Sequence, residues 1–208
     1  MVQELAGRGV LAALALEMAD SGASTAGLPR QSSEEDVQRA LRWNGQGWPW
    51  PHYGPAVMAA VTAGVPVVGV NLARAQLRAT MTDHALDAAL AAPAFQAQQQ
   101  AIRDGHCGLL PDAQIVPMTR MQIARDRHMA AALAGLAVPG KTVLLIAGAA
   151  HVDPQLGVPL HLPTGLASRS IVLRGGTGPK RDYCEDMRRS LNPPAAPQPL
   201  PKASSSQP

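Results

Sequence analysis

Residues Lys141 to Pro159, KTVLLIAGAAHVDPQLGVP, contain the clearest indication of the fold. A short apolar run stops at small residues, which is typical of a strand that is buried on both faces. His151 follows this run, and in an open α/β sheet ligands bind beyond the carboxyl ends of the strands. His151 is therefore a candidate site residue. The alternative is that Gly148 and its neighbouring alanines form a tightly packed turn, in which His151 bonds a nearby carbonyl.

Further apolar runs lie on both sides of this stretch. VPVVGVNL at residues 65–72 predicts a second buried strand, and RSIVLR at 169–174 predicts a last one. VLAALALEM at 10–18 fits either a strand or a helix. Segments with helical patterns separate these runs. Strands that alternate with helices predict an α/β fold with a mostly parallel sheet flanked by helices.

The helical patterns differ in length and in the clarity of their ends. The segment Asn44–Pro55 contains three prolines and three glycines and predicts irregular structure. Helices are expected at about residues 32–42 and 56–64, in two short stretches within 74–101 that break near Pro93, and from Met118 to Ala134. The helices between about residues 74 and 135 predict a small helical subdomain inserted in the sheet.

Length and composition predict one globular domain over residues 1–191. The chain has 208 residues, of which 46% are apolar, and the Pro- and Ser-rich residues 192–208 have the composition of a disordered tail. The net charge is only +3 and the basic residues are scattered, which argues against nucleic-acid binding. The chain contains no secretory signal and no stretch of about 18 apolar residues. Membrane association would therefore need a lipid anchor that this chain lacks.

Two cysteines, Cys107 and Cys184, lie far apart in the sequence. They either form one long-range disulfide or stay free, and their spacing leaves both possibilities open. Two cysteines do not form a zinc site by themselves.

Glu17 lies near the end of the apolar run at residues 10–18. His151 likewise lies just beyond the apolar run that begins after Lys141. We expect this carboxylate and imidazole to converge at one edge of the sheet. Such a pair binds a divalent metal or acts as acid and base, although a metal normally needs three or more protein ligands. The alternative is that Glu17 caps a helix or pairs with an arginine.

The long helix predicted from Met118 carries a cation on its apolar face. Met121 and Met129 belong to one apolar stripe at helical spacing, and Arg125 falls in the middle of this stripe. A buried guanidinium needs an anionic partner, which is either a structural carboxylate such as Asp104 or a carboxylate or phosphate of a ligand. His128 lies at the edge of the same stripe.

Most of the aromatic side chains lie in one segment. Only 3% of the residues are aromatic, yet WPWPHYGP at residues 48–55 contains three rings and one imidazole. Trp50 and its neighbours are suited to form one wall of an apolar pocket, or else they cover a loop. Phenolate and imidazole are known axial ligands of haem iron. The candidate ligands are Tyr53, His52, His106 and His128.

Several of these pieces occur together in a known family. The chain resembles the ChaN-like haem-binding lipoproteins, which are related to the Tiki and erythromycin-esterase-like group. The matching pieces run in order over about residues 10–175: ALEM at 15–18, W-x-W-P-H-Y-G-P at 48–55, VPVVGVNLAR at 65–74, GHCGLLP at 105–111, M-x-x-x-Q-x-x-RD-x-x-MA at 118–130, and the AGAAH…GVP segment.

The resemblance implies an α/β sandwich with a helical subdomain. It also implies a cell-envelope protein that binds haem for iron uptake, as a homodimer that pairs two subunits around the haem. Family members use a tyrosine for iron, which here points to Tyr53. Arg125 would bind a haem propionate or form a supporting ion pair.

The wider group also has a Gly-Glu-x-His motif on its first strand, near the positions that match Glu17 and His151. This motif is absent here, and the strand that carries it would precede Met1. We therefore expect that the first strand is missing, through truncation or a misassigned start. The second hypothesis is a metal-dependent hydrolase in which Glu17 and His151 hold a divalent metal. The sequence leaves catalytic activity open.

Overall fold

A three-stranded parallel sheet lies at the centre of the computed structural model, which describes residues 1–173 and 182–191. Its strands are β1 (Leu11–Asp20), β2 (Val67–Asn71) and β3 (Thr142–Ile146), in the order β2-β1-β3. Leu14 of β1 is paired with a residue of each neighbouring strand, Val67 and Leu144. The predicted α/β class with a parallel sheet is therefore confirmed.

β1 is the central strand and its middle is inaccessible to solvent. Leu14, Ala15 and Leu16 are completely buried, because strands pair on both sides of β1 and helices cover both of its faces. The ambiguous run at residues 10–18 is thus a strand, and the run at 65–72 is a strand as predicted.

β3 was predicted to be buried on both faces, and this expectation is wrong. Its residues Val143–Ile146 are only half-buried. Within the described residues, no strand pairs with the outer side of β3. The outer side of β2, in contrast, receives the segment after β1, since Gly69 N–H donates to the carbonyl of Ala23 at 2.9 Å.

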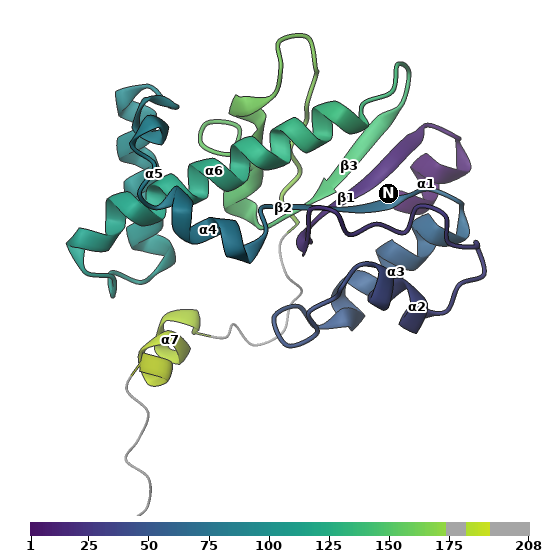
Figure 1. Ribbon diagram of the computed structural model, residues 1–208, viewed down its shortest axis with the longest axis horizontal. Coiled ribbons are helices and arrows are strands. Elements are labelled where there is room, and N and C mark those ends of the chain that lie inside the picture. The colour runs from purple at the N-terminus through teal and green to yellow at the C-terminus, as the bar shows by residue number, and fades with distance from the viewer. Residues whose placement is uncertain (174–181, 192–208) are drawn as a thin grey trace, which may run out of the picture.

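Helices cover both faces of the sheet (Figure 1). One face packs against α1 (Val2–Gly7) and α3 (Trp50–Thr62), and α2 (Glu34–Ala40) lies against α3. The long helix α6 (Asp112–Leu136) crosses the other face and contacts all three strands. Each face has its own apolar core, one centred on Leu14, Leu16 and Val57 and the other on Val70 and Met129.

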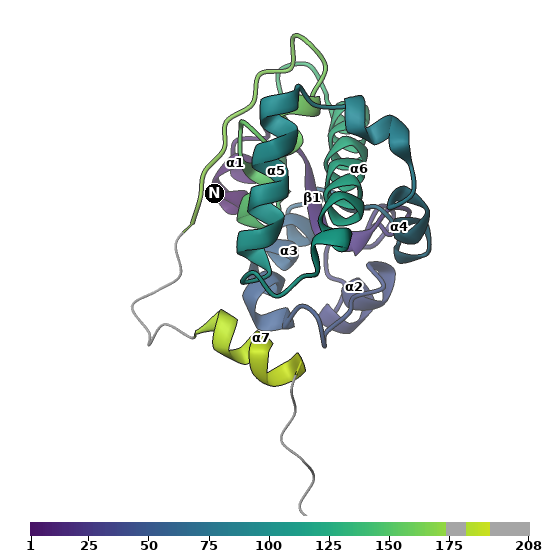
Figure 2. The ribbon, with the colours of Figure 1, turned by 90° about the vertical axis from the view of Figure 1, so that its left-hand side faces the viewer.

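The outer side of α6 carries the helical subdomain expected between the second and third strands. It consists of α4 (Arg74–Thr80), the 3-10 helix η1 (His84–Ala88) and α5 (Ala92–Gly105), all of which contact α6. Figure 2 shows α5 lying alongside α6. The break expected near Pro93 is present, because η1 ends at Ala88 and α5 begins at Ala92, with Pro93 in its first turn.

Prolines were misread as helix boundaries in two places. The segment before Pro55 was expected to be irregular, yet α3 begins at Trp50 and contains Pro55. The long helix was expected from Met118, yet α6 begins at Asp112 and contains Pro117. Each of these two prolines is the sixth residue of its helix, just beyond the first four backbone N–H groups, which have no partner within a helix. The missing N–H therefore removes only one backbone hydrogen bond near the helix end.

The predicted strand at 169–174 is wrong for the part that the structure describes. Residues 169–173 form no regular structure, and Ile171, Val172 and Leu173 are exposed. A strand needs a neighbour for its backbone hydrogen bonds, and these residues pair with none of the described strands. Residue 174 and the tail at 192–208 lie outside the described residues.

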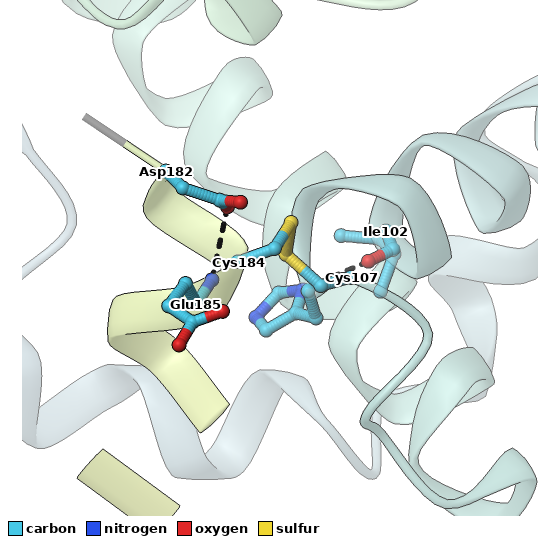
Figure 3. The surroundings of a disulfide bond; sticks show 6 residues. Ile102, Cys107, Asp182, Cys184 and Glu185 are labelled. Atoms are coloured by element: carbon cyan, nitrogen blue, oxygen red, sulfur yellow. Dashed lines mark hydrogen bonds between the residues drawn. A yellow bond between two sulfur atoms is a disulfide. The ribbon is translucent and has the colours of Figure 1, made fainter. Parts of the chain in front are cut away.

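The last described element, α7 (Tyr183–Leu191), is joined to the helical subdomain by a disulfide. Figure 3 shows Cys184 of α7 bonded to Cys107, which follows α5. The Cα atoms of the two cysteines are 5.6 Å apart, and 77 positions separate them in sequence. The structure thus answers the question that the spacing left open. Among the described helices, none combines the length and the apolar character that crossing a membrane requires.

Candidate functional site

A buried polar network lies beyond the middle of the sheet, where the ends of all three strands meet α6. Glu17 belongs to β1, Asn71 ends β2, and Gly148 and His151 follow β3. His151 belongs to the short 3-10 helix η2 (Ala149–Val152). α6 contributes Gln122, Arg125 and Asp126. We call these seven residues the strand-end network.

Glu17 is bound on three sides. The Arg125 guanidinium donates to its Oε1 at 2.6 Å, and the Gly148 N–H donates to its Oε2 at 2.6 Å. His151 Nε2 lies 3.3 Å from Oε1. Arg125 also donates to the Asn71 side-chain oxygen at 3.0 Å. The expected convergence of Glu17 and His151 is therefore present, and so is the alternative in which Glu17 pairs with an arginine.

Arg125 has a different partner from the one that the sequence suggested. Asp104 was offered as its structural partner, but Asp104 accepts a hydrogen bond from Gln100 on α5. The partner of Arg125 is Glu17, which is 108 positions away in sequence. This pairing joins α6 to β1. The Arg125 guanidinium thus has its hydrogen-bond partners within the protein, namely Glu17 and Asn71.

His151 is held between two carboxylates. Its Nδ1 lies 2.5 Å from Asp126 Oδ1, on the side opposite to the contact with Glu17, and the Gln122 amide nitrogen lies 3.0 Å from the same Nδ1. Asp126 is fully buried, and Glu17 and His151 are each only 4% exposed. At that depth, groups of opposite charge stabilise one another strongly.

Burial and pairing shift the pKa values of these groups. Burial opposes the ionisation of Glu17, but the hydrogen bond with His151 and its positive charge, the Gly148 N–H and Arg125 lower the pKa of Glu17 to about 2. Burial also opposes the protonation of His151, but the hydrogen bonds to Asp126 and Glu17 raise its pKa to about 9. Burial raises the pKa of Asp126, and its hydrogen bond with His151 acts against that shift. At neutral pH, His151 is therefore protonated between its two carboxylates.

The network is poorly suited to a metal ion. The donor atoms of Glu17 and His151 already have protein partners, and only the buried Oδ2 of Asp126 lacks one. A divalent metal needs several free donors, and here it would have to displace the hydrogen bonds and ion pairs that these side chains already make. No group of three or more suitable metal-binding side chains occurs in residues 1–173 and 182–191. The residues present do not fit a divalent metal.

Tyr53 lies in a cluster of rings near the amino end of α3. Its ring centroid is 5.6 Å from that of Trp43, 6.0 Å from that of Trp48 and 6.4 Å from that of His52. Trp50 packs edge-on against Trp43 at 5.1 Å. We call these five residues the aromatic cluster. The Tyr53 side chain is half-buried, and within the described residues its hydroxyl has no hydrogen-bond partner.

The aromatic cluster is close enough to the strand-end network for the charge of Glu17 to be felt at Tyr53. Burial, and to a lesser degree the charge of Glu17, raises the pKa of the Tyr53 hydroxyl. The Tyr53 hydroxyl therefore keeps its proton at neutral pH. A cation or an electrophilic centre bound to the oxygen would favour the phenolate.

The remaining histidine candidates lie apart from one another. His52 is exposed on α3. His106 Nδ1 bonds the Ile102 carbonyl oxygen at 2.8 Å at the end of α5, and His128 Nε2 bonds the Ser21 hydroxyl at 2.6 Å. His128 thus fits the simpler alternative of a hydrogen-bonded imidazole at the edge of the stripe. The structure does not bring these three side chains together.

The sequence analysis missed four members of the strand-end network: Asn71, Gln122, Asp126 and Gly148. Two signals were available. Gln122, Arg125 and Asp126 recur at spacings of three and four, which places them on one face of a helix. Asn71 ends the second apolar run just before a predicted helix, and polar residues at that point lie at the edge of a parallel sheet where ligands bind.

Comparisons with known proteins agree with this architecture. Among solved structures, the chain is similar to one described as cofacial heme binding to ChaN of Campylobacter jejuni, with a TM-score of 0.61 and 22% sequence identity. The match covers 77% of this chain and 65% of that chain, so this chain spans slightly less than two thirds of that protein. At this identity, the likeness concerns the fold. A comparison with curated proteins gives no match.

A family model matches a much larger part of the chain than any single motif. It is described as haem-binding uptake, Tiki superfamily, ChaN, and it matches residues 1–162. This range includes the aromatic cluster and every member of the strand-end network. The resemblance drawn from the sequence motifs is confirmed, and the chain belongs to the ChaN family of haem-binding uptake proteins in the Tiki superfamily.

Proposed function

We propose that this protein binds haem through Tyr53 and serves haem or iron uptake at the cell envelope. The observation that carries the proposal is the environment of Tyr53. A phenol whose hydroxyl has no partner among the described residues lies half-buried between indole and imidazole rings. Phenolate is a known axial ligand of haem iron, and aromatic rings pack against the flat porphyrin. Family membership supports the choice of ligand.

The residues around Tyr53 fit haem better than they fit a bare cation. The cluster offers one phenol and large apolar surfaces, without the several free oxygen or nitrogen donors that a hydrated metal ion requires. Bound ferric iron would favour the phenolate and so overcome the raised pKa of Tyr53. Arg125 is not available to a propionate, because Glu17 and Asn71 occupy its guanidinium.

Titration with hemin tests this proposal. We expect a saturable Soret band, and a phenolate-type ferric haem spectrum that is lost in Tyr53→Phe. Tyr183→Phe is the matched control, since Tyr183 is exposed on α7 and should leave the spectrum unchanged. Absence of a saturable band in the wild-type protein would refute haem binding. An unchanged spectrum in Tyr53→Phe would refute Tyr53 as the ligand.

A homodimer is part of the same proposal, because two exposed faces of haem favour closure by a second subunit. Sedimentation velocity with and without hemin measures this directly. We expect the sedimentation coefficient to rise with hemin to the value of a dimer, and a constant monomer value at saturation would contradict it. Fractionation of the native host, followed by detection of the protein in the envelope or the cytosol, tests the location.

A metal-dependent hydrolase that uses Glu17 and His151 is the less favoured function. The contact between these two residues is what it requires, but their donor atoms are already paired. A hydrolase would bind metal tightly and stoichiometrically and would lose turnover in His151→Ala. Plasma emission spectroscopy of the purified protein, together with an esterase assay, distinguishes the two functions.

A further inference from the structure

The disulfide between Cys107 and Cys184 belongs neither to the strand-end network nor to the aromatic cluster. It joins the turn after α5 to the first turn of α7 (Figure 3). Both cysteines are partly exposed. Thiol–disulfide exchange requires that the attacking thiol can reach a sulfur of the bond. The disulfide is therefore within reach of a reductant while the protein is folded.

α7 depends on this disulfide for its position. Figure 1 shows α7 at the margin of the molecule, and it makes no extensive contact with any other described helix or strand. The ion pair between Arg189 and Glu185 lies within α7 and does not fasten it to a neighbour. A helix of nine residues without extensive packing is only marginally stable in water. Loss of the disulfide should therefore release α7.

Cys107 has a backbone conformation that is unfavourable for a residue with a side chain. Its φ is +57°, in the left-handed region, and its N–H donates to the Asp104 carbonyl at 3.0 Å. Glycine is the usual residue at such a position just after a helix, because it has no Cβ atom. A residue that is kept in an unfavourable conformation indicates a role for its side chain. At Cys107 that role is the bond to Cys184.

We propose that the Cys107–Cys184 disulfide is a redox-sensitive switch that controls the attachment of α7. The reductant is a dithiol. One thiolate of the dithiol attacks a sulfur of the disulfide, the S–S bond breaks, and the other cysteine leaves as a thiolate that takes up a proton. The second thiol of the reductant then resolves the mixed disulfide. Two electrons and two protons pass from the dithiol to the two cysteines, and the reverse exchange closes the switch.

A purely structural disulfide is the alternative, and it differs in what reduction does to the rest of the fold. A structural disulfide stabilises a protein because it restricts the unfolded chain, while the native structure holds the two ends together in any case. Where reduction releases α7, the folded state also gains freedom, so that the stabilisation is smaller. The sheet and α6 contact each other directly and should stay folded.

Reduction of the folded full chain with dithiothreitol tests the proposal. We expect alkylation and mass spectrometry to find two free thiols without any denaturant. Hydrogen–deuterium exchange should then show that α7 loses protection by about tenfold or more, while β1 and α6 keep theirs. Protection of α7 that survives reduction would overturn the proposal, because other contacts would then hold the helix. A disulfide that is reduced only after unfolding would overturn it as well.

Urea denaturation separates the switch from a structural disulfide. The two cysteines are 77 positions apart, and a structural disulfide over that separation should lower the denaturation midpoint by about 2 M when it is reduced. For the switch we expect a fall of less than about 1 M. A larger fall would overturn the proposal and identify the disulfide as structural.

Double variants open the switch without a reductant. Cys107→Ser combined with Cys184→Ser should give the exchange pattern of the reduced protein, with or without dithiothreitol. Cys107→Gly combined with Cys184→Ser should give the same pattern and an equal or higher urea midpoint, because glycine suits the φ of +57°. A lower midpoint would contradict a role for Cys107 beyond the turn itself.

Ser190→Ala is the matched control on α7, since the Ser190 hydroxyl bonds only the Met187 carbonyl of the same helix. It should keep the disulfide and the wild-type exchange pattern. None of these measurements involves hemin. Failure of the switch therefore leaves the proposed function intact, and absence of haem binding leaves the switch intact.

Discussion

Two histidines on neighbouring 3-10 helices have opposite environments in this protein. His151 of η2 lies between Glu17 and Asp126 and has partners for both ring nitrogens. His161 belongs to the 3-10 helix η3 (Val158–His161) and lines an open hollow together with Ala88 and Arg127, but its Nε2 is buried and has no partner in the described residues. A paired and buried imidazolium contributes to the stability of the fold, whereas a buried ring nitrogen without a partner costs free energy. Two histidines of one short segment therefore contribute very differently to the stability of the fold.

The largest effect that we expect follows from removing Glu17. Glu17→Ala leaves Arg125 buried without its anionic partner and takes one of the two carboxylates from His151. We expect a loss of about 3–5 kcal/mol in the free energy of unfolding, the usual cost of breaking a buried ion pair. Urea denaturation followed by circular dichroism measures it.

Glu35→Ala is the matched control, because Glu35 also pairs with an arginine but lies exposed on α2. It should leave the denaturation midpoint almost unchanged. Equal effects of the two substitutions would show that burial of the Glu17 pair is unimportant, and the comparison with His161 would lose its basis.

The next effect is a dependence of stability on pH. The pKa of His151 is about 9 in the folded protein, against 6.5 for the free side chain, so His151 contributes stability that is fully present below pH 6.5. This contribution is lost as the pH rises through 9, and it amounts to about 3.5 kcal/mol, at roughly 1.4 kcal/mol for each pKa unit. Urea denaturation between pH 6 and 10 measures the slope.

His151→Phe provides the reference for this measurement. The loss of stability between pH 6.5 and 9 should be much smaller in the variant than in the wild type, even though the variant is less stable throughout. On the acid side, the lowered pKa of Glu17 and the raised pKa of Asp126 act in opposite directions, so the alkaline side is the clearer test. Parallel pH profiles of the two proteins would contradict a protonated His151.

The smallest effect concerns His161 in the absence of ligand. His161→Leu removes a buried nitrogen that has no partner in the described residues, so we expect the free energy of unfolding to stay unchanged or to rise by up to about 1 kcal/mol. Thermal denaturation of the ligand-free protein measures it. A loss of several kcal/mol, like that of Glu17→Ala, would make His161 a structural residue and remove the contrast with His151.

Local patterns were sufficient for the central elements. The apolar runs at 65–72 and 141–146 are β2 and β3 as predicted, and the run at 10–18, which fitted a strand or a helix, is the fully buried strand β1. The prediction that Glu17 and His151 converge is confirmed for the same reason, since parallel strands bring their carboxyl ends together. The helix boundaries were less accurate, because Pro55 and Pro117 are tolerated one turn inside a helix.

Pairing partners could not be predicted in this way. Asp104 and Glu17 were equally plausible partners of Arg125 in terms of charge, and only the packing of α6 across β1 selects Glu17. The disulfide between Cys107 and Cys184 likewise depends on the tertiary structure, because the two cysteines are 77 positions apart in sequence. The hollow at His161 has no sequence signature, because its walls come from three separate segments of the chain.

The sequence by itself determined the α/β class, the parallel sheet, the family and the position of the polar groups at the strand ends. These properties depend on neighbouring residues and on the period of apolar side chains. Only the tertiary structure decided which histidine is paired and which is free, because that depends on the distance between groups that are far apart in sequence. Two imidazoles ten positions apart differ because Asp126 of α6 reaches His151, while Nε2 of His161 meets no such group within the described chain.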